Sequence, residues 1–188
     1  MHIITCHLKS KLLTFPGGFF STRDEDLRAQ AAAAALIRRT AEAAQVRREV
    51  NGLLAGNAAD GVIVLGDLND GPEAATSQLL LGARGSEIGT LGFDRPDQDD
   101  AGRLFNTDAL IDEDRRFSRV HRGVDELLDQ ILASEDLFPR TDGVHRDLPV
   151  VDSHIDFSSQ LPSIPDNPNM RAREIEPDHA PVTAVFGL

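Results

Sequence analysis

The chain has 188 residues and a formal net charge of −12, from 31 acidic and 19 basic residues. Its hydrophobic fraction of 40% is typical of a globular domain, and no stretch approaches the roughly 20 apolar residues that a membrane span needs. The acidic balance disfavours a broad nucleic-acid surface, although bound divalent cations can offset carboxylate charge at a catalytic site. The chain has no Trp and no Tyr, so base stacking could use only its nine Phe residues or Arg planes.

The length predicts a single domain that spans residues 1–188, and the cysteine content is compatible with a reducing compartment. Residues 1–10 lack the basic start, apolar core and cleavage site of a signal peptide, so we expect a cytoplasmic location unless a segment upstream directs export. Cys6 is the only cysteine, which excludes an intramolecular disulfide. A lone cysteine in an apolar strand is typical of a core residue, not of a nucleophile.

The first third of the chain predicts a strand, a loop and a long helix. Residues 2–8 are apolar and β-branched, as in a buried strand, and residues 9–20 contain a Pro-Gly-Gly loop signal. A helix is predicted from Ser21 or Thr22, with Arg39 among the charged residues on its solvent side. Its predicted apolar face recurs at spacings of three and four and consists of Leu27, Ala31, Ala34, Ile37, Ala41 and Ala44.

The middle of the chain contains the strongest strand signal. Residues 62–65 (VIVL) predict a buried strand, and residues 66–71 the turn that follows it. Pro72 suits the first position of a short helix that reaches Leu80. Residues 82–103 are rich in Gly, Asp and Pro and predict an exposed loop.

The last third predicts mainly strands. Residues 117–120 and 127–133 could form a hairpin around a turn at residues 121–123. Residues 158–173 are polar and carry prolines, which predicts a long loop, and residues 180–186 predict a final strand. The alternation of strands and helices indicates an α/β (α+β) layered sandwich flanked by helices.

The segment VIVLGDLND carries the clearest chemical signal. Its strand delivers Asp67 and Asn69 to its carboxyl end, where loops form sites in layered sheets. The two side chains point the same way if the extended backbone continues, and could then hold a water and contact a metal or a phosphate oxygen. The alternative is structural, because Asp and Asn after a strand often bond the local backbone.

Three further segments carry titratable side chains beside strands. Asp178 and His179 begin the last predicted strand and could bind a metal or a phosphate, or simply lie at a surface terminus. Asp129 interrupts an apolar run and needs a buried partner, for which a histidine is well suited, although nearby backbone would also serve. His7 ends the first strand and could be a catalyst or a satisfied core residue.

Taken together, the order of these segments resembles the endonuclease/exonuclease/phosphatase superfamily. The segments are HLKS (residues 7–10), GDLND (66–70), LDQILAS (128–134) and DHAPV (178–182). The stretches SKLLTFPGG, AATSQLLLG and RFSRVHRGVDELLDQILAS are similar to those of bacterial nuclease-like members. The resemblance covers residues 2–186 and implies a metal-dependent phosphoesterase, with the second half of a four-layered sandwich.

The resemblance also implies a role for each matched residue. Asp67 would activate or orient the attacking water, and Asn69 would orient the substrate. The Asp178–His179 pair would contact water or metal and the scissile phosphate, with Asp129 orienting His179. His7 would be a general acid. The implied cofactor is Mg²⁺, or Mn²⁺, as one or two ions held by Asp67, Asn69, Asp178 and His179.

The chain also departs from the family pattern. It corresponds to the C-terminal portion, so the Asn and the metal-ligating Glu of the first half have no counterpart, and we expect weak metal affinity. Pro177 replaces a common Ser, and Gln130 replaces a His or Tyr. The expected function is a nuclease-like phosphodiester hydrolase that acts on a phosphate ester such as DNA. The alternatives are a phosphatase or phosphodiesterase of small or lipid phosphates, and an inactive remnant that needs a partner.

A further expectation concerns association. Half of a sandwich would leave one apolar sheet face uncovered, which soluble monomers seldom tolerate. We therefore expect self-association, or a partner chain that covers this face.

Overall fold

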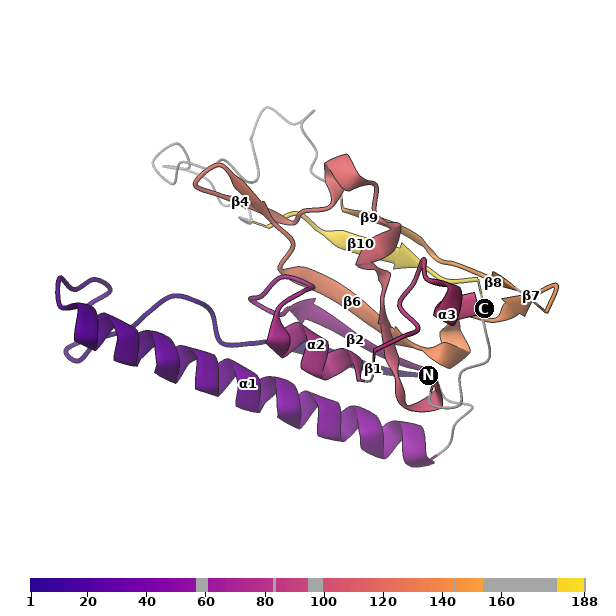
Figure 1. Cartoon of the computed structure of the whole chain (residues 1–188), viewed down its shortest axis with the longest axis horizontal. Coiled ribbons are helices and arrows are strands. Elements are labelled where there is room, and N and C mark those ends of the chain that lie inside the picture. The colour runs from indigo at the N-terminus through magenta and orange to yellow at the C-terminus, as the bar shows by residue number, and fades with distance from the viewer. Residues whose placement is uncertain (57–60, 83, 95–99, 144, 154–178, 188) are drawn as a thin grey trace.

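The fold centres on a four-stranded sheet (Figure 1). The computed structural model describes residues 1–56, 61–82, 84–94, 100–143, 145–153 and 179–187. The main sheet contains β1 (His2–His7), β2 (Val62–Asp67), β6 (Asp129–Ser134) and β3 (Leu104–Asn106) in the order β1-β2-β6-β3. Strand β1 is parallel to β2, and the β2–β6 and β6–β3 pairs are antiparallel. The side chains at the carboxyl ends of β1 and β2 therefore lie beside the start of β6.

Smaller strand pairs and helices complete a mixed α/β fold, as predicted. The paired strands are β4 (Arg119–His121) with β5 (Val124–Glu126), β7 (Arg140–Thr141) with β8 (His145–Arg146), and β9 (Val150–Ser153) with β10 (Val182–Val185). The α-helices in the described residues are α1 (Glu25–Gly56), α2 (Ala75–Leu81) and α3 (Leu91–Asp94). Short 3₁₀ turns are η1 (Asp100–Gly102), η2 (Thr107–Leu110), η3 (Glu113–Arg115) and η4 (Glu135–Leu137). No described helix is long and apolar enough to cross a membrane.

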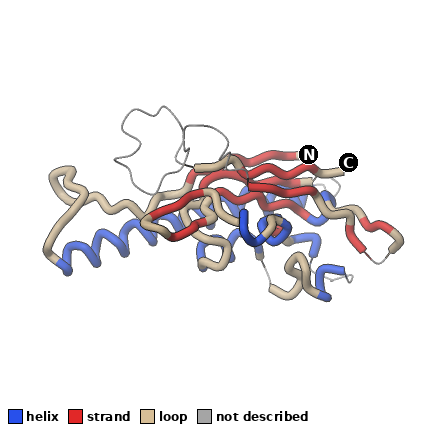
Figure 2. The backbone as a smooth tube through the Cα atoms, turned by 90° about the horizontal axis from the view of Figure 1, so that it is seen from above, coloured by secondary structure: helices blue, strands red, loops and turns tan. Residues whose placement is uncertain are grey.

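The two faces of the main sheet are covered differently. One face, with Val62, Val64 and Leu132, packs with α1 and α2 in a single apolar cluster. On the other face, the residues Ile63, Leu65, Ile131, Ala133 and Phe105 pack with the rings of Phe93, Phe138 and Phe186. Figure 2 shows the strands largely on one side of the molecule and the helices on the other.

Helix α1 begins later than predicted. It starts at Glu25, and Asp24 rather than Ser21 or Thr22 provides the cap. The Asp24 Oδ1 atom accepts a hydrogen bond of 3.0 Å from the Leu27 amide, which satisfies one of the unpaired donors of the first turn. The Thr22 hydroxyl instead accepts from the Asp24 amide. Thr22 therefore orders the entry to the helix without capping it.

The predicted apolar face of α1 was wrong. Ile37 is 69% exposed, and the buried residues are Ala35, Ala43, Val50 and Leu54, with Arg39 between them. Alanines occur all around the N-terminal half of the helix, so their spacing did not single out one face. The face that packs on the sheet is decided by the larger apolar side chains of the C-terminal half.

Arg39 is buried because it forms a polar anchor between α1 and the turn after β2. Its Nε atom lies 3.1 Å from Asp70 Oδ2, and its Nη1 donates to the Lys9 carbonyl at 3.0 Å. Asp70 also accepts from the Thr76 hydroxyl at 2.7 Å and pairs with Lys11 Nζ at 3.2 Å. Burial acts to raise the pKa of Asp70, but these donors and the nearby positive charges lower it overall. The anchor therefore holds an ionised carboxylate directly beside Asn69.

We predict that Arg39→Met lowers the free energy of unfolding by about 2 kcal/mol, because it leaves the partly buried Asp70 carboxylate without its guanidinium partner. Urea unfolding followed by circular dichroism measures this change. Arg38→Met is the matched control: Arg38 is exposed and pairs with Glu42 across one helical turn, so its loss should cost about 0.5 kcal/mol or less. Equal effects in the two variants would contradict the anchor.

The segment predicted as an exposed loop, residues 82–103, is partly structured and buried. It contains α3 and η1, and Phe93 is 3% exposed. The Phe93 ring packs edge-on against Phe105 and Phe138, with centroid distances of 5.1 and 5.7 Å. The Gly and Asp content correctly indicated irregular backbone, but it carried no information on this aromatic contact. The predicted loop at residues 158–173 lies outside the described residues.

The predicted hairpin is shorter than expected. Strand β4 pairs with β5, not with residues 127–133, through a two-residue turn in which Arg122 and Gly123 have positive φ angles of 53° and 75°. Such a turn suits the twist of a tight hairpin. Residues from Asp129 onward instead form β6, which lies between β2 and β3 and pairs with both, because this position buries their apolar side chains.

The expected uncovered sheet face corresponds, among the described residues of the main sheet and the β9–β10 pair, to exposed apolar side chains on β1, β9 and β10. On β1, Ile3 is 56% exposed, whereas its row partner Ile63 on β2 is 8% exposed. In the β9–β10 pair, Val150 and Val185 are opposite each other and are 74% and 68% exposed. Self-association through these residues stays a prediction: light scattering should give a mass above that of one chain, and a monomer at micromolar concentrations would contradict it.

Candidate active site

Three polar side chains form one row across the end of the main sheet. The register places His7 of β1 opposite Asp67 of β2, and Asp67 opposite Asp129 of β6. Because opposite residues project from the same face, this row continues the face that carries Ile63 and Leu65. The apolar rows of that face are therefore followed by a polar row where β1 and β2 end.

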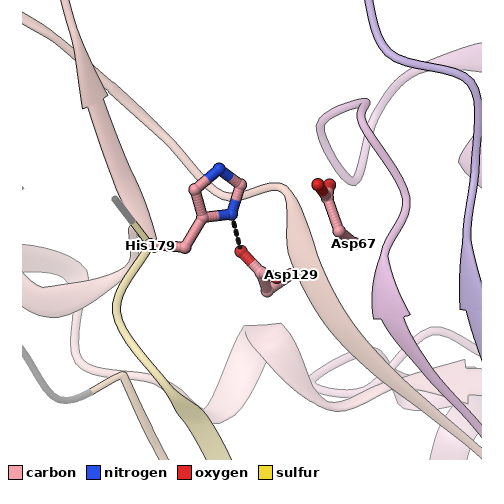
Figure 3. Close-up of side chains that lie close together, drawn as sticks. All are labelled: Asp67, Asp129 and His179. Carbon is pink, nitrogen blue, oxygen red and sulfur yellow. Dashed lines mark hydrogen bonds and ion pairs between the residues drawn. The ribbon is translucent and has the colours of Figure 1, made fainter. Parts of the chain in front are cut away.

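His179 completes the row from a separate strand pair. It lies just before β10, and its Nδ1 atom is 2.7 Å from Asp129 Oδ2 (Figure 3). Figure 3 also shows Asp67 on the other side of Asp129, with the second ring nitrogen of His179 pointing away from the Asp129 carboxylate. The hydrogen bond expected between Asp129 and a histidine is therefore present. An Nδ1–H···carboxylate bond leaves Nε2 as the ring atom that faces outward.

Ser118 brings the two partners together, and no sequence signal pointed to it. Its hydroxyl oxygen accepts from the amides of Leu128 and Asp129 at 3.1 and 3.2 Å. Its carbonyl oxygen accepts from the Ala180 amide at 2.7 Å. The side chain is completely buried. Ser118 therefore links the start of β6 to Ala180, the residue after His179.

We predict that Ser118→Ala lowers stability by about 1–3 kcal/mol, because two buried amides lose their acceptor. Ser118→Thr keeps the hydroxyl oxygen and should be milder. Urea unfolding measures both variants. Ser153→Ala is a matched control, since the buried Ser153 hydroxyl contacts only the Phe117 carbonyl among the described residues. A smaller loss of stability at Ser118 than at Ser153 would contradict the proposed role of Ser118 in linking β6 to Ala180.

Asp67 is a half-buried carboxylate in a crowded charge environment. Its Oδ1 atom accepts from the Asn69 amide at 2.8 Å, and its Oδ2 atom lies 3.4 Å from His7 Nε2. Burial is the main cause that raises its pKa, and the negative charge of Asp129 adds to it, against smaller lowering by Asn69, His179 and His7. A positive charge brought to this carboxylate would therefore stabilise its ionised form.

Asn69 does not continue the strand, contrary to the simplest expectation. Strand β2 ends at Asp67, and Asn69 has a φ of 54°, in the left-handed region that Asn tolerates better than most residues. Its side-chain amide donates to the Leu8 carbonyl at 2.9 Å, which ties the ends of β1 and β2 together. The structural interpretation of Asn69 thus has direct support, while its role toward substrate stays a prediction.

The remaining predicted residues differ in what the structure shows. His7 has 75% of its side chain exposed, so it is not a satisfied core histidine. Asp178 lies outside the described residues. Cys6 donates to the Leu65 carbonyl, and burial, aided by the Asp67 charge, raises the pKa of its thiol to about 11. A thiol with this pKa is almost fully protonated at neutral pH, which agrees with its interpretation as a packing residue.

Three residues could together hold a divalent metal ion. Asp67, Asp129 and His179 each offer one ligand atom, and these atoms lie within 4.8 Å of one another. Two carboxylates and an imidazole form a donor set that suits Mg²⁺ through oxygen and Mn²⁺ through both atom types. The predicted set named Asp67 and His179 but had Asn69 and Asp178 in place of Asp129. From the sequence, Asp129 was predicted only as the partner of a histidine, and the structure adds it as a candidate ligand.

Comparison with known proteins gives one match. The model of the endonuclease/exonuclease/phosphatase family matches residues 7–163. The matched range includes His7, Asp67, Asn69 and Asp129. No curated protein and no solved structure gives a match.

Proposed function

We propose that the chain, which belongs to the endonuclease/exonuclease/phosphatase family, is a nuclease-like hydrolase of phosphodiesters. Members of this class hydrolyse phosphate esters with the help of a divalent metal ion. The proposal for this chain is that a water molecule attacks phosphorus at the polar end of the main sheet. The observation that carries it is the 2.7 Å Asp129–His179 hydrogen bond beside the Asp67 carboxylate.

Each residue of the row has a proposed part in the reaction. Asp67 accepts a proton from the attacking water or orients it, for which its raised pKa is suited. Asp129 keeps His179 in one tautomer and orientation, so that Nε2 faces the phosphoryl group. His7 lies exposed at the other side of Asp67, where it could protonate the leaving oxygen. Asn69 positions Asp67 through its backbone amide.

The divalent cation would be Mg²⁺ or Mn²⁺, held by the carboxylates of Asp67 and Asp129, with Asn69 and Asp178 as further proposed ligands, while the His179 ring faces the phosphoryl group. When bound, it would stabilise negative charge on the phosphoryl oxygens. The Asp129–His179 bond is compatible with a cation at the carboxylates, because the ring approaches Asp129 through Nδ1 alone.

The test is hydrolysis of bis(p-nitrophenyl) phosphate and of plasmid DNA with Mg²⁺, Mn²⁺ or EDTA. Metal-dependent cleavage of both substrates is expected. Cleavage of p-nitrophenyl phosphate or a phosphoinositide alone would favour the phosphatase alternative, which the net charge of −12 supports. Hydrolysis of none of these substrates, by a folded protein, would contradict the proposed activity and favour a non-catalytic chain.

A further inference from the structure

A pocket adjoins the polar row at Asn69 and Leu128. It has a volume of about 780 Å³, which is within the range of small-molecule sites. Asn69 and Leu128 are among its lining residues, and Leu128 directly precedes Asp129 of the polar row in the chain. Its other walls come from the loop after β1 and from the β4–β5 hairpin. A ligand in this pocket would therefore reach from the hairpin to the edge of the proposed active site.

The pocket is basic although the chain is acidic. Its lining carries one acid, Glu126, and the cations Lys11, Arg28, Arg119 and Arg122. Lys11 pairs with Asp70, and Arg28 pairs with Glu25, so these two charges are partly compensated. In a chain of net charge −12, this concentration of cations favours an anionic ligand.

The hairpin cations are the ones best placed for such a ligand. Arg119 Nε is a buried nitrogen that has no hydrogen-bond partner among the described residues. Its Nη2 atom has only a distant contact of 3.5 Å with His121 Nδ1. Arg122 lies at the exposed tip of the hairpin and forms no ion pair within the described part of the chain. Arg119 forms no ion pair within the described part of the chain, so its guanidinium keeps donor capacity for an anionic ligand in the pocket it lines.

Part of the pocket lining is apolar and aromatic. It contains Leu12, Leu13, Phe15 and Phe20, and Phe20 is 67% exposed. The adjacent Phe19 is 66% exposed. Exposed aromatic rings beside arginines are the combination that binds unpaired nucleotides, because the base stacks on the ring while the phosphate pairs with the guanidinium. The chain has no Trp or Tyr, so phenylalanine is the residue available for this contact.

We infer that this pocket binds an unpaired nucleotide adjacent to the cleaved phosphodiester, with its base on Phe20 and its phosphate on Arg119 and Arg122. The inference rests on the proposed function, because it places the substrate strand across the polar row. It predicts a preference for single-stranded over double-stranded nucleic acid, since a paired base cannot leave its stack to reach Phe20.

The test measures binding without turnover. Fluorescence anisotropy of a labelled oligothymidylate, in EDTA, should give saturable binding that is tighter than binding of the matched duplex. Phe20→Ala and Arg122→Gln should each weaken the binding by about tenfold. Arg122→Gln should also reduce by about one the number of counterions released on binding, which is read from the salt dependence of the affinity. Arg48→Gln removes the same charge from an exposed site on α1 and should leave binding unchanged.

The outcomes separate this inference from the proposed function. Equal affinity of the wild type, Phe20→Ala and Arg122→Gln for the oligonucleotide would overturn it, even if bis(p-nitrophenyl) phosphate is hydrolysed. Loss of binding in both variants would support it, even if that ester is not hydrolysed. Binding of phosphoinositide vesicles but not of the oligonucleotide, with the same sensitivity to Phe20→Ala, would overturn it in favour of a lipid.

Discussion

His179→Ala is expected to lower kcat for metal-dependent phosphodiester hydrolysis by about 10²–10³-fold, the usual cost of removing a positioned donor that stabilises charge on the reacting oxygens. The His179 ring is held by Asp129 at 2.7 Å and lies beside Asp67, so no other histidine in the described residues occupies an equivalent place. The side chain of His179 is only partly buried, and the variant should therefore fold. Initial rates with bis(p-nitrophenyl) phosphate measure the change, and circular dichroism checks the fold.

Two further variants make this prediction sharper. Asp129→Asn keeps the shape of the side chain but removes the charge that supports a protonated ring, so it should share much of the loss. Because the pair acts as a unit, the double variant His179→Ala/Asp129→Asn should be little worse than His179→Ala alone. His145→Ala, at an exposed histidine of β8, is the control and should keep full activity. Activity of His179→Ala within a few-fold of wild type would place the site elsewhere.

Asp67→Asn is expected to reduce hydrolysis by about 10²–10⁴-fold as well, because an amide can neither accept the proton of the attacking water nor offer a charged oxygen to a cation. The same change should weaken binding of Mn²⁺, which calorimetric titration measures independently of turnover. Asp114→Asn, at an exposed position of η3, removes the same charge and should affect neither measurement.

The stability of Asp67→Asn gives a second, opposite expectation. Because burial raises the folded-state pKa of Asp67, ionising this group favours the unfolded chain as the pH rises through that pKa. An uncharged amide avoids this cost, so the melting temperature at neutral pH should equal or exceed that of the wild type. A variant that is both inactive and clearly less stable would indicate a structural role for Asp67, and would contradict our assignment.

The sequence by itself determined the features that depend on local pattern. The apolar run at residues 62–65 predicted β2, and its end at GDLND predicted where Asp67 lies, because a strand directs the next residues to the sheet edge. Asp129 was predicted to pair with a histidine, with nearby backbone as the alternative, because a carboxylate within an apolar strand needs a hydrogen-bonding partner. These inferences use only neighbours in the chain and the free energy of burying charge.

Only the tertiary structure decided which residues far apart in the chain meet. The buried face of α1 was mispredicted because alanines surround the helix, and its contact with the sheet, including the Arg39–Asp70 anchor, depends on β2 and α2. Ser118 lies in an ordinary polar stretch, yet its hydroxyl and carbonyl join Asp129 to the residue after His179. The basic pocket likewise combines a loop, a helix and a hairpin. Such contacts leave no periodic signal, because each requires a single side chain whose partners are set by the packing of distant elements.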